Sequence, residues 1–252
     1  MDRWVGKVTV VTGASAGIGA AIAEALVKEG LTVVGFARRL ERLETLSASL
    51  KGAKGKFYAK QCDVSKEEDL LDAFKWVKTE FGGIDVLVNN AGVVNGRKFL
   101  DDDAASLRNM LNVNFMATAI GTQEAVASMQ SRNVPGHIIN INSVVGHKVP
   151  DNVMSSSAYC STKFAVTALC ETVRKEIATA KSDIKITSLS PGFVATEIIQ
   201  QSGMTESAAL ELYKTLPCLE PQDVANAVVY VLGTPKNVQI TELKIQPLHE
   251  MF

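Results

Sequence analysis

Short runs of apolar, mostly β-branched residues alternate along this chain with longer stretches in which apolar residues recur every three or four positions. The short runs are typical of buried strands, and the longer stretches are typical of helices with one face against a core. The runs predict strands over residues 7–12, 32–36, 56–61, 84–88, 136–141, 184–189 and 238–245. The stretches predict helices over residues 20–29, 67–81, 101–131, 156–180 and 221–232.

The order of these elements predicts the fold class. Strands that alternate with helices form a mostly parallel sheet with helices on both faces. We therefore expect a single-domain, doubly wound α/β fold over residues 1–252 with a seven-stranded sheet. Residues 1–130 would form a cofactor half, and residues 131–252 a catalytic and substrate half. The segment 197–220 is predicted to be a mobile connection to the last helix.

One predicted helix, over residues 101–131, carries an unusual interior. Asn112 and Asn114 lie inside it, and asparagine is a poor residue for the interior of a helix. The pair predicts a local distortion that could free a backbone carbonyl to hold water.

A glycine-rich loop joins the first strand to the first helix, over residues 12–19. Glycines at this place permit a tight turn and let backbone N–H groups approach a pyrophosphate at the positive end of a helix. The spacing is T-G-x-x-x-G-x-G, and the strand–loop–helix context favours dinucleotide binding over a plain turn. The candidate contacts are Gly13, Ser15, Ala16, Gly17, Ile18 and Gly19.

The end of the second strand bears on the choice of dinucleotide. An acidic residue near this place binds the ribose hydroxyls of NAD, whereas an arginine accommodates the 2′-phosphate of NADP. Here Ala37 takes the acidic place and is followed by Arg38 and Arg39, so the sequence predicts NADP(H). The alternative is that both arginines only begin a solvated helix over residues 40–43.

Two further strand ends carry polar candidates. Asp63 and Val64 follow the third strand; Asp63 could accept a hydrogen bond from an adenine amino group or could cap the next helix, and both readings remain open. Asn90, Ala91 and Gly92 follow the fourth strand, where small residues and amides suit a close approach to a cofactor.

The candidate chemistry centres on Tyr159 and Lys163, at the start of the helix predicted over residues 156–180. Positions four apart share one face of a helix, so the phenol and the ammonium should be neighbours. A phenol with a pKa near 10 is a poor acid or base at neutral pH, and a nearby cation favours the phenolate. The pattern Y-x-x-x-K is common by itself, and it is the other motifs of this chain that favour a functional interpretation of it.

The composition excludes several classes of function. A formal net charge of −1 provides no basic field for nucleic acid, and no uncharged apolar stretch is long enough for a membrane span. The four cysteines form no metal-like spacing with the three histidines, so we expect no metal site. Reduced thiols and the lack of an apolar leader predict a cytoplasmic protein.

Taken together, these motifs resemble the short-chain dehydrogenase/reductase family along nearly the whole chain. The matching pieces follow the family's order: Thr12-Gly13-x-x-x-Gly17-x-Gly19, Asp63, Asn89-Asn90-Ala91-Gly92, Asn114, Ser143, Tyr159-x-x-x-Lys163, and Pro191-Gly192 with Thr196. The resemblance implies a Rossmann fold. The interval from Ser143 to Tyr159 is a few residues longer than the commonest family spacing, which affects the wall of the substrate pocket more than the chemistry.

The resemblance also implies roles for these residues. Tyr159 would be the general acid/base, and Lys163 would lower its pKa and hydrogen-bond the nicotinamide ribose. Ser143 would hold the substrate oxygen, and Asn114 would support a water-linked proton path. Pro191, Gly192, Val194 and Thr196 would contact the nicotinamide end of the cofactor.

Within the family, the chain looks most like the cytosolic NADP(H)-dependent branch, with insect farnesol-dehydrogenase-like proteins and vertebrate carbonyl and hydroxysteroid reductases. The implied substrates are apolar alcohols or carbonyl compounds such as terpenoids, odorants or steroids. The candidate pocket residues, all apolar, are Val94, Val145, Val149, Val153, Met154, Phe193, Ile198 and Met204. By analogy, the long helices predict a homodimer or homotetramer.

Two alternative functions remain open. A 3-ketoacyl reductase would use the same catalytic residues and would favour a basic patch for an acidic carrier, to which Arg97, Lys98 and Lys148 could contribute. An NADPH-binding scaffold with vestigial activity is the alternative from another class. The full set of four catalytic residues argues against it, since an idle site could lose any of them without unfolding.

Overall fold

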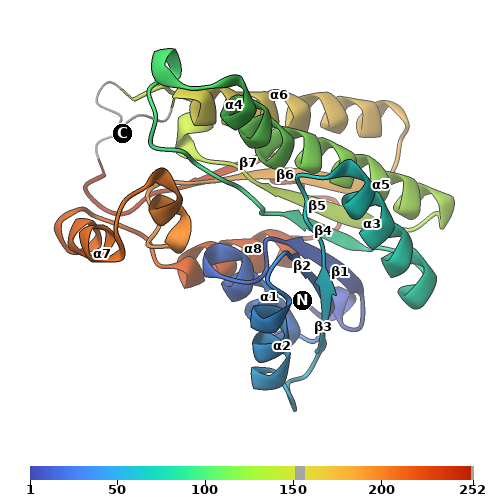
Figure 1. Ribbon diagram of the computed structural model, residues 1–252. Coiled ribbons are helices and arrows are strands. Elements are labelled where there is room, and N and C mark those ends of the chain that lie inside the picture. Colours follow the sequence, from blue (N-terminus) through green and yellow to red (C-terminus); the bar gives the residue numbers. More distant parts are fainter. Residues whose placement is uncertain (151–156, 251–252) are drawn as a thin grey trace.

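A seven-stranded parallel sheet forms the centre of the molecule in a computed structural model that describes residues 1–150 and 157–250 (Figure 1). The strand order is β3-β2-β1-β4-β5-β6-β7, and every strand pair in it is parallel. The strands are β1 (Val8–Thr12), β2 (Thr32–Ala37), β3 (Lys56–Gln61), β4 (Val86–Asn89), β5 (Gly136–Ile141), β6 (Ile184–Pro191) and β7 (Glu242–Ile245). The doubly wound α/β fold predicted from the sequence is confirmed.

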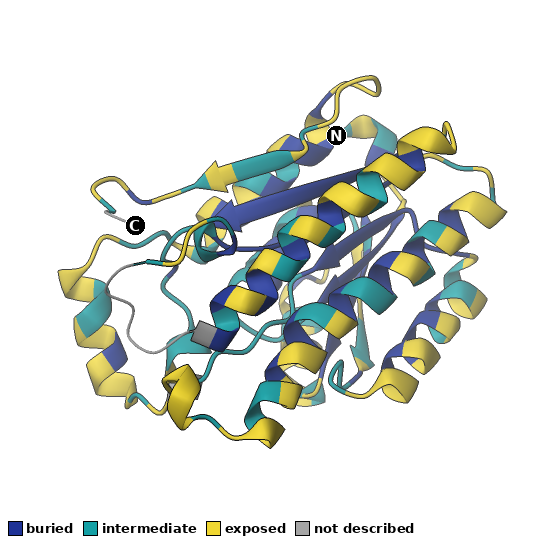
Figure 2. Ribbon diagram, turned by 90° about the horizontal axis from the view of Figure 1, so that it is seen from above, coloured by how far each residue is buried: buried dark blue, intermediate teal, exposed yellow. Residues whose placement is uncertain are grey.

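Helices cover both faces of the sheet, because a parallel sheet must bury both of its faces. One face carries α1 (Gly17–Lys28), α2 (Leu40–Ser49) and α8 (Pro221–Gly233). The other carries α3 (Glu67–Phe81), α4 (Ala104–Leu111), α5 (Ala117–Ser131) and α6 (Ser157–Thr179). The central strands are buried, and the helices in Figure 2 have buried residues on the side toward the sheet and exposed residues on the opposite side. Short 3₁₀ helices occupy Asp2–Trp4, Phe99–Asp101 and Val144–Gly146.

The helix predicted over residues 101–131 contains the expected distortion. Helix α4 runs without a break into a π-helical segment, Asn112–Met116, and then into α5. Asn114 lies within this segment and is buried. This π-helical segment is the distortion that the asparagines predict. Such segments are frequent at functional sites.

The segment 197–220, which the sequence predicts to be mobile, has regular structure over much of its length. It contains a 3₁₀ helix, Glu197–Ser202, and helix α7 (Glu206–Thr215). The Thr205 side chain caps α7 by accepting a hydrogen bond from the Ala208 N–H at 3.3 Å. The segment is too short and too exposed to show a clear helical period, because Ala209 is the buried residue of this helix.

The topology places a crevice at the carboxyl ends of the strands. The chain crosses from β3 on one side of β1 to β4 on the other, so the strand order reverses between β1 and β4. The Asn89 amide at the end of β4 donates to the Thr118 carbonyl of α5 at 3.2 Å and to Asn140 Oδ1 of β5 at 2.8 Å. Ligands of open α/β sheets bind at such a switch point, and these bonds hold its edge in place.

Candidate active site

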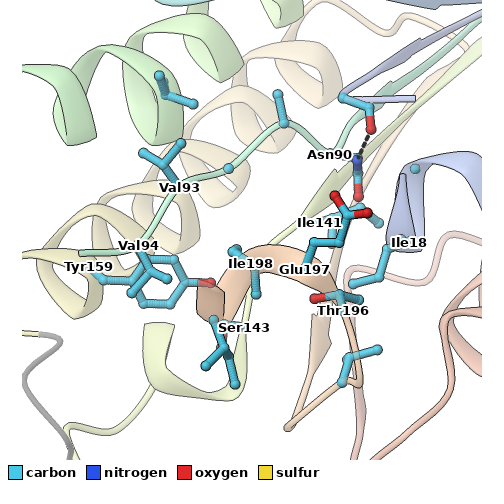
Figure 3. A pocket seen from close by; sticks show the side chains of 18 of the residues that line it. Ile18, Asn90, Val93, Val94, Ile141, Ser143, Tyr159, Thr196, Glu197 and Ile198 are labelled. Atoms are coloured by element: carbon cyan, nitrogen blue, oxygen red, sulfur yellow. Dashed lines mark hydrogen bonds between the residues drawn. The ribbon is translucent and has the colours of Figure 1, made fainter. Parts of the chain in front are cut away.

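A cavity of about 1150 Å³ opens at this switch point and extends from the glycine-rich loop to Tyr159 and the segment after β6. It joins side chains from the two predicted halves of the chain (Figure 3). The cofactor residues predicted from the sequence all line it: Gly13, Ser15, Ala16, Gly17, Ile18, Gly19, Arg38, Arg39, Asp63, Val64, Asn90, Ala91, Gly92, Tyr159, Lys163, Pro191, Gly192, Val194 and Thr196.

The glycine-rich loop has the geometry of an anion-binding turn. Helix α1 begins at Gly17 after Ala16, and no side chain caps this end, so the first N–H groups of the helix remain available to a ligand. Gly13 has a φ of +69°, which favours glycine. A Cβ atom at Gly19 would lie 2.3 Å from the Gly13 carbonyl oxygen, so only glycine fits there. These features suit the pyrophosphate of a dinucleotide.

Asn90 fixes this loop to the neighbouring strand. Its side-chain amide donates to the Thr12 carbonyl at 2.9 Å, and the Thr12 hydroxyl accepts from the backbone N–H groups of Asn90 and Ala91 at 2.9 and 3.0 Å. Asp63 forms a turn before α3, because its Oδ1 accepts from the Ser65 N–H at 3.1 Å and from the Ser65 hydroxyl at 2.8 Å. Asp63 therefore shapes the start of this segment while it also lines the cavity.

The two arginines after β2 have different surroundings. The Arg38 side chain is exposed at the cavity, and the described part of the chain places no carboxylate within ion-pair distance of it. The Arg39 guanidinium donates to the Ser15 hydroxyl at 3.2 Å and pairs with Glu197 at 3.1 Å. Both arginines line the cavity.

Tyr159 and Lys163 lie on the first turns of α6, and the Lys163 Nζ atom is 5.6 Å from the centre of the Tyr159 ring. The Tyr159 hydroxyl points into the cavity near Ser143 (Figure 3). A hydrogen bond joins the two side chains. Ser143 follows β5 and also caps the next 3₁₀ helix, because its hydroxyl accepts from the Val145 N–H at 3.3 Å. Ser143 is thus both a cap and a cavity residue.

Burial determines the protonation of this pair. It raises the pKa of the Tyr159 phenol to about 12, while the hydrogen bond with Ser143 opposes the rise. Burial also lowers the pKa of Lys163 to about 8, and its Nζ donates to the Ile141 carbonyl at 2.9 Å. The sequence predicted a lowered phenol pKa. In this arrangement burial raises the phenol pKa instead, so that prediction is wrong.

Asn114 does not line the cavity, but it connects three parts of the site. Its Oδ1 accepts from the Val93 N–H at 2.8 Å, and its Nδ2 donates to the Val93 carbonyl at 2.9 Å and to the Thr162 hydroxyl at 3.2 Å. Thr162 in turn donates to the Tyr159 carbonyl at 2.7 Å. The π-helical segment thereby holds the strand-end loop after β4 against the helix that carries Tyr159.

The end of the cavity near Tyr159 is mostly apolar. Five of the predicted substrate residues line it, namely Val94, Val145, Phe193, Ile198 and Met204. The prediction for Val149 is wrong: this residue follows the 3₁₀ helix after β5, is 60% exposed and does not line the cavity. Val153 and Met154 lie outside the described residues.

Sequence reasoning missed several lining residues. Leu212 belongs to α7 and Leu216 follows it, in the segment predicted to be mobile, and Val113 belongs to the π-helical segment. Glu250, near the carboxyl end of the described chain, lines the cavity and accepts from the Phe193 N–H at 2.7 Å. No clear helical period marked α7, and no local signal marked Glu250.

Three further findings concern features other than this cavity. Arg97 pairs with Asp103 at 2.6 Å, so its charge is compensated. Among the described residues, no group of three or more His, Cys, Asp or Glu side chains is placed to hold a metal ion. No helix over residues 1–150 and 157–250 has the length and apolar character needed to cross a membrane.

Residues 7–207 match the family described as short chain dehydrogenase. Together with the fold and the placement of its motifs, this match shows that the chain belongs to the short-chain dehydrogenase/reductase family. The chain is similar to the farnesol dehydrogenase of Aedes aegypti, with 52% identity over 254 residues and complete coverage of both sequences. It is also similar to the human dehydrogenase/reductase SDR family member 11, with 43% identity over 256 residues that cover 100% of this chain and 98% of the relative.

Solved structures share the same fold. An alcohol dehydrogenase from Thermococcus sibiricus, complexed with 5-hydroxy-NADP, has a TM-score of 0.84 and 29% identity, with 97% of each chain covered. A serine dehydrogenase complexed with NADP⁺ has a TM-score of 0.87 and 28% identity, with 97% of this chain and 96% of the other covered. A family member from Burkholderia phymatum, in complex with NAD, has a TM-score of 0.85 and 26% identity over 97% of this chain and 90% of the other.

Proposed function

We propose that this protein is an NADP(H)-dependent oxidoreductase that interconverts an apolar alcohol and its aldehyde or ketone. The observation that carries the proposal is the continuity of one cavity. Its polar end is formed by the glycine-rich loop and Arg38, and its apolar end contains Tyr159, Ser143 and Lys163. A dinucleotide and a small apolar substrate would therefore meet at the Tyr159 hydroxyl.

The residues of the polar end fit NADP(H). The uncapped start of α1 would bind the pyrophosphate, and the exposed Arg38 would pair with a 2′-phosphate. Val194 and Thr196 would hold the nicotinamide carboxamide. When bound, the cofactor supplies or accepts the hydride. Some of the structural neighbours carry NADP and one carries NAD, so the preference for NADP(H) rests on the arginine and the missing acid at Ala37.

Side chains of this protein would transfer the proton and orient the substrate. Tyr159 would donate its proton to the carbonyl oxygen in reduction and remove it from the alcohol in oxidation. Ser143, already in hydrogen-bond contact with Tyr159, would hold the same oxygen. The Lys163 charge favours the phenolate and so assists proton release from a phenol whose pKa burial raises to about 12. Asn114 would keep this helix in place and support a water-linked proton path.

Terpenoid, odorant or steroid-like compounds are the substrate class that we propose. The apolar lining around Val94, Ile198 and Leu212 would bury a hydrocarbon body while the alcohol or carbonyl oxygen reaches Tyr159. The relative from Aedes aegypti, named farnesol dehydrogenase, supports this class. A 3-ketoacyl reductase is less well supported because Arg97, one of the three basic candidates for a carrier patch, is paired with Asp103.

The test is the variant Tyr159→Phe, assayed against a panel of alcohols, aldehydes and ketones of increasing chain length. We expect it to lose about three orders of magnitude in kcat, because the proton donor is removed. Binding of NADPH, followed by its fluorescence, should persist. Tyr230→Phe is the control, since Tyr230 lies exposed on α8, away from the cavity. Unchanged turnover in Tyr159→Phe would refute the mechanism, and NADPH binding without turnover of any substrate by the wild type would support the scaffold instead.

We also propose a homodimer or homotetramer, with a face formed by α4, the π-helical segment and α6. Leu111, Met116 and Phe164 are exposed large apolar residues on these three neighbouring elements. Exposed apolar side chains that gather on one face often mark an interface between proteins. A monomeric mass in light scattering would contradict this assembly.

A further inference from the structure

One acidic residue on the substrate side of the cavity reaches across to the cofactor side. Glu197 directly follows Thr196 and begins the 3₁₀ helix after β6. Its carboxylate accepts from Arg42 Nη1 at 2.7 and 2.9 Å and from Arg39 Nη1 at 3.1 Å. These contacts join residues 155 and 158 positions apart in the sequence. Glu197 and Arg39 line the cavity, whereas Arg42 lies behind them on α2.

The bridge lies just after β2, where the proposed function places a 2′-phosphate. Arg39 begins α2 directly after Arg38, and its guanidinium also donates to Ser15 of the glycine-rich loop. An arginine at the end of the second strand is the group that accommodates a 2′-phosphate. Here, however, Arg39 already has a carboxylate partner, while Arg38 has none among the described residues. The two arginines are therefore unequal in the positive charge that they can offer.

Glu197 carries a negative charge at neutral pH. Its hydrogen bond from Arg42, with those of Arg39, lowers the pKa of the carboxyl group below its ordinary value, against an opposing effect of burial. A 2′-phosphate that approaches Arg39 would thus meet a carboxylate on the same guanidinium. Like charges that share one partner repel each other, and the repulsion weakens with salt when the groups are partly exposed, as these three side chains are.

We propose that Glu197 is a specificity-determining residue that limits the preference for a 2′-phosphorylated dinucleotide. It competes with the 2′-phosphate for Arg39, and Arg42 moderates this competition by sharing the carboxylate. NAD(H) lacks the phosphate and does not enter the competition. The inference rests on the proposed function, since it assigns a selectivity role within the same cofactor site.

The experiment compares ligands that differ only in the 2′-phosphate. Isothermal titration calorimetry would measure the dissociation constants of adenosine 2′,5′-bisphosphate and 5′-AMP, and of NADP⁺ and NAD⁺, for the wild type and for Glu197→Gln. We expect the variant to bind the two phosphorylated ligands about three- to tenfold more tightly and the other two within about twofold of the wild type. The gain should shrink as the ionic strength rises.

A control and a double-mutant cycle make the test specific. Glu211→Gln removes an equal charge from α7, where Glu211 pairs with exposed Lys214 at 2.7 Å, and it should leave all four constants unchanged. Arg42→Gln should weaken binding of the 2′-phosphorylated ligands, because Glu197 would then rely on Arg39 alone. This loss should become smaller in the double variant with Glu197→Gln.

The outcomes separate this inference from the proposed function. If Glu197→Gln changes the affinities for NADP⁺ and NAD⁺ equally, or weakens the binding of NADP⁺, the selectivity role of Glu197 is wrong. The oxidoreductase proposal stands in either case. If the wild type binds neither dinucleotide, both proposals fail. A gain that is confined to the 2′-phosphorylated ligands and is screened by salt supports the role of Glu197.

Discussion

Lys163 is a charged group that the fold buries almost completely, since it is 4% exposed. Burial lowers its pKa to about 8, from an ordinary value of 10.5. The unfolded chain therefore binds more protons than the folded protein between about pH 8 and 10.5, so stability rises with pH across this window. Below pH 8 the folded protein holds a buried ammonium, at a cost of about 3 kcal/mol relative to a group with an unshifted pKa.

The variant Lys163→Met should consequently be more stable than the wild type at pH 7. Methionine has a similar length and removes the buried charge. The variant also loses the hydrogen bond from Nζ to the Ile141 carbonyl, which costs about 1 kcal/mol. The net expectation at pH 7 is a gain of about 2 kcal/mol in the free energy of unfolding. The gain should fall as the pH rises and should reverse sign by about pH 10.5, because Lys163 is then neutral in the folded protein and half neutral in the unfolded chain, so little of the charge effect remains to offset the lost hydrogen bond.

Urea denaturation without added dinucleotide, followed by tryptophan fluorescence at several pH values from 7 to 10.5, would measure this difference. Lys214→Met is the control, because Lys214 is 69% exposed and its replacement should produce no such pH-dependent difference. Turnover by Lys163→Met should fall steeply even though the protein is more stable. A variant that is less stable than the wild type at pH 7, or a stability difference that does not change with pH, would refute the assignment of burial as the dominant effect on Lys163.

Two further predictions concern the scaffold of the site. Asn114→Ala leaves the part-buried N–H and carbonyl of Val93 without their side-chain partner, so it should lower the free energy of unfolding by about 2–4 kcal/mol in urea denaturation and also reduce kcat. A loss below about 1 kcal/mol would contradict this. Gly19→Ala places a Cβ atom 2.3 Å from the Gly13 carbonyl oxygen, so calorimetry should detect no NADP⁺ binding to this variant. The control is Gly233→Ala, which should bind NADP⁺ normally because a Cβ atom at Gly233 meets no other atom within 4 Å. Equal binding by the two variants would count against the assignment of the glycine-rich loop to the cofactor.

The sequence predicts those parts of the fold that depend on local patterns. The strand Val8–Thr12 is a short β-branched run. The loop that follows needs glycine at position 13, where the backbone is left-handed, and at position 19, where a Cβ atom would not fit. Such requirements act over a few residues, so they are visible in the order of the amino acids. The same is true of Tyr159 and Lys163, whose spacing of four fixes their common face once α6 is assigned.

Other parts of the site depend on contacts between distant residues. The pairing of Glu197 with Arg42 spans 155 positions, and no pattern in either segment indicates it. Helix α7 was missed because it is short and exposed, although it brings Leu212 to the cavity. Val149 was predicted to line the pocket because it is apolar and close to Ser143 in sequence, yet the chain directs it to solvent. Apolar character alone does not tell on which side of a loop a residue lies.

The polar groups of this site are more buried than the stability of the folded protein alone would favour. Lys163 and Asn114 lie in the interior, and the Tyr159 phenol is kept neutral by burial that raises its pKa to about 12. Each of them is compensated by a specific partner: the Ile141 carbonyl for Lys163, the Val93 backbone for Asn114 and Ser143 for Tyr159. An apolar core in the same place would make the folded protein more stable, but it could not transfer a proton. The apolar strands and helices around the site supply the stability that allows this arrangement to persist, so variants that remove its charge should gain stability and lose turnover together.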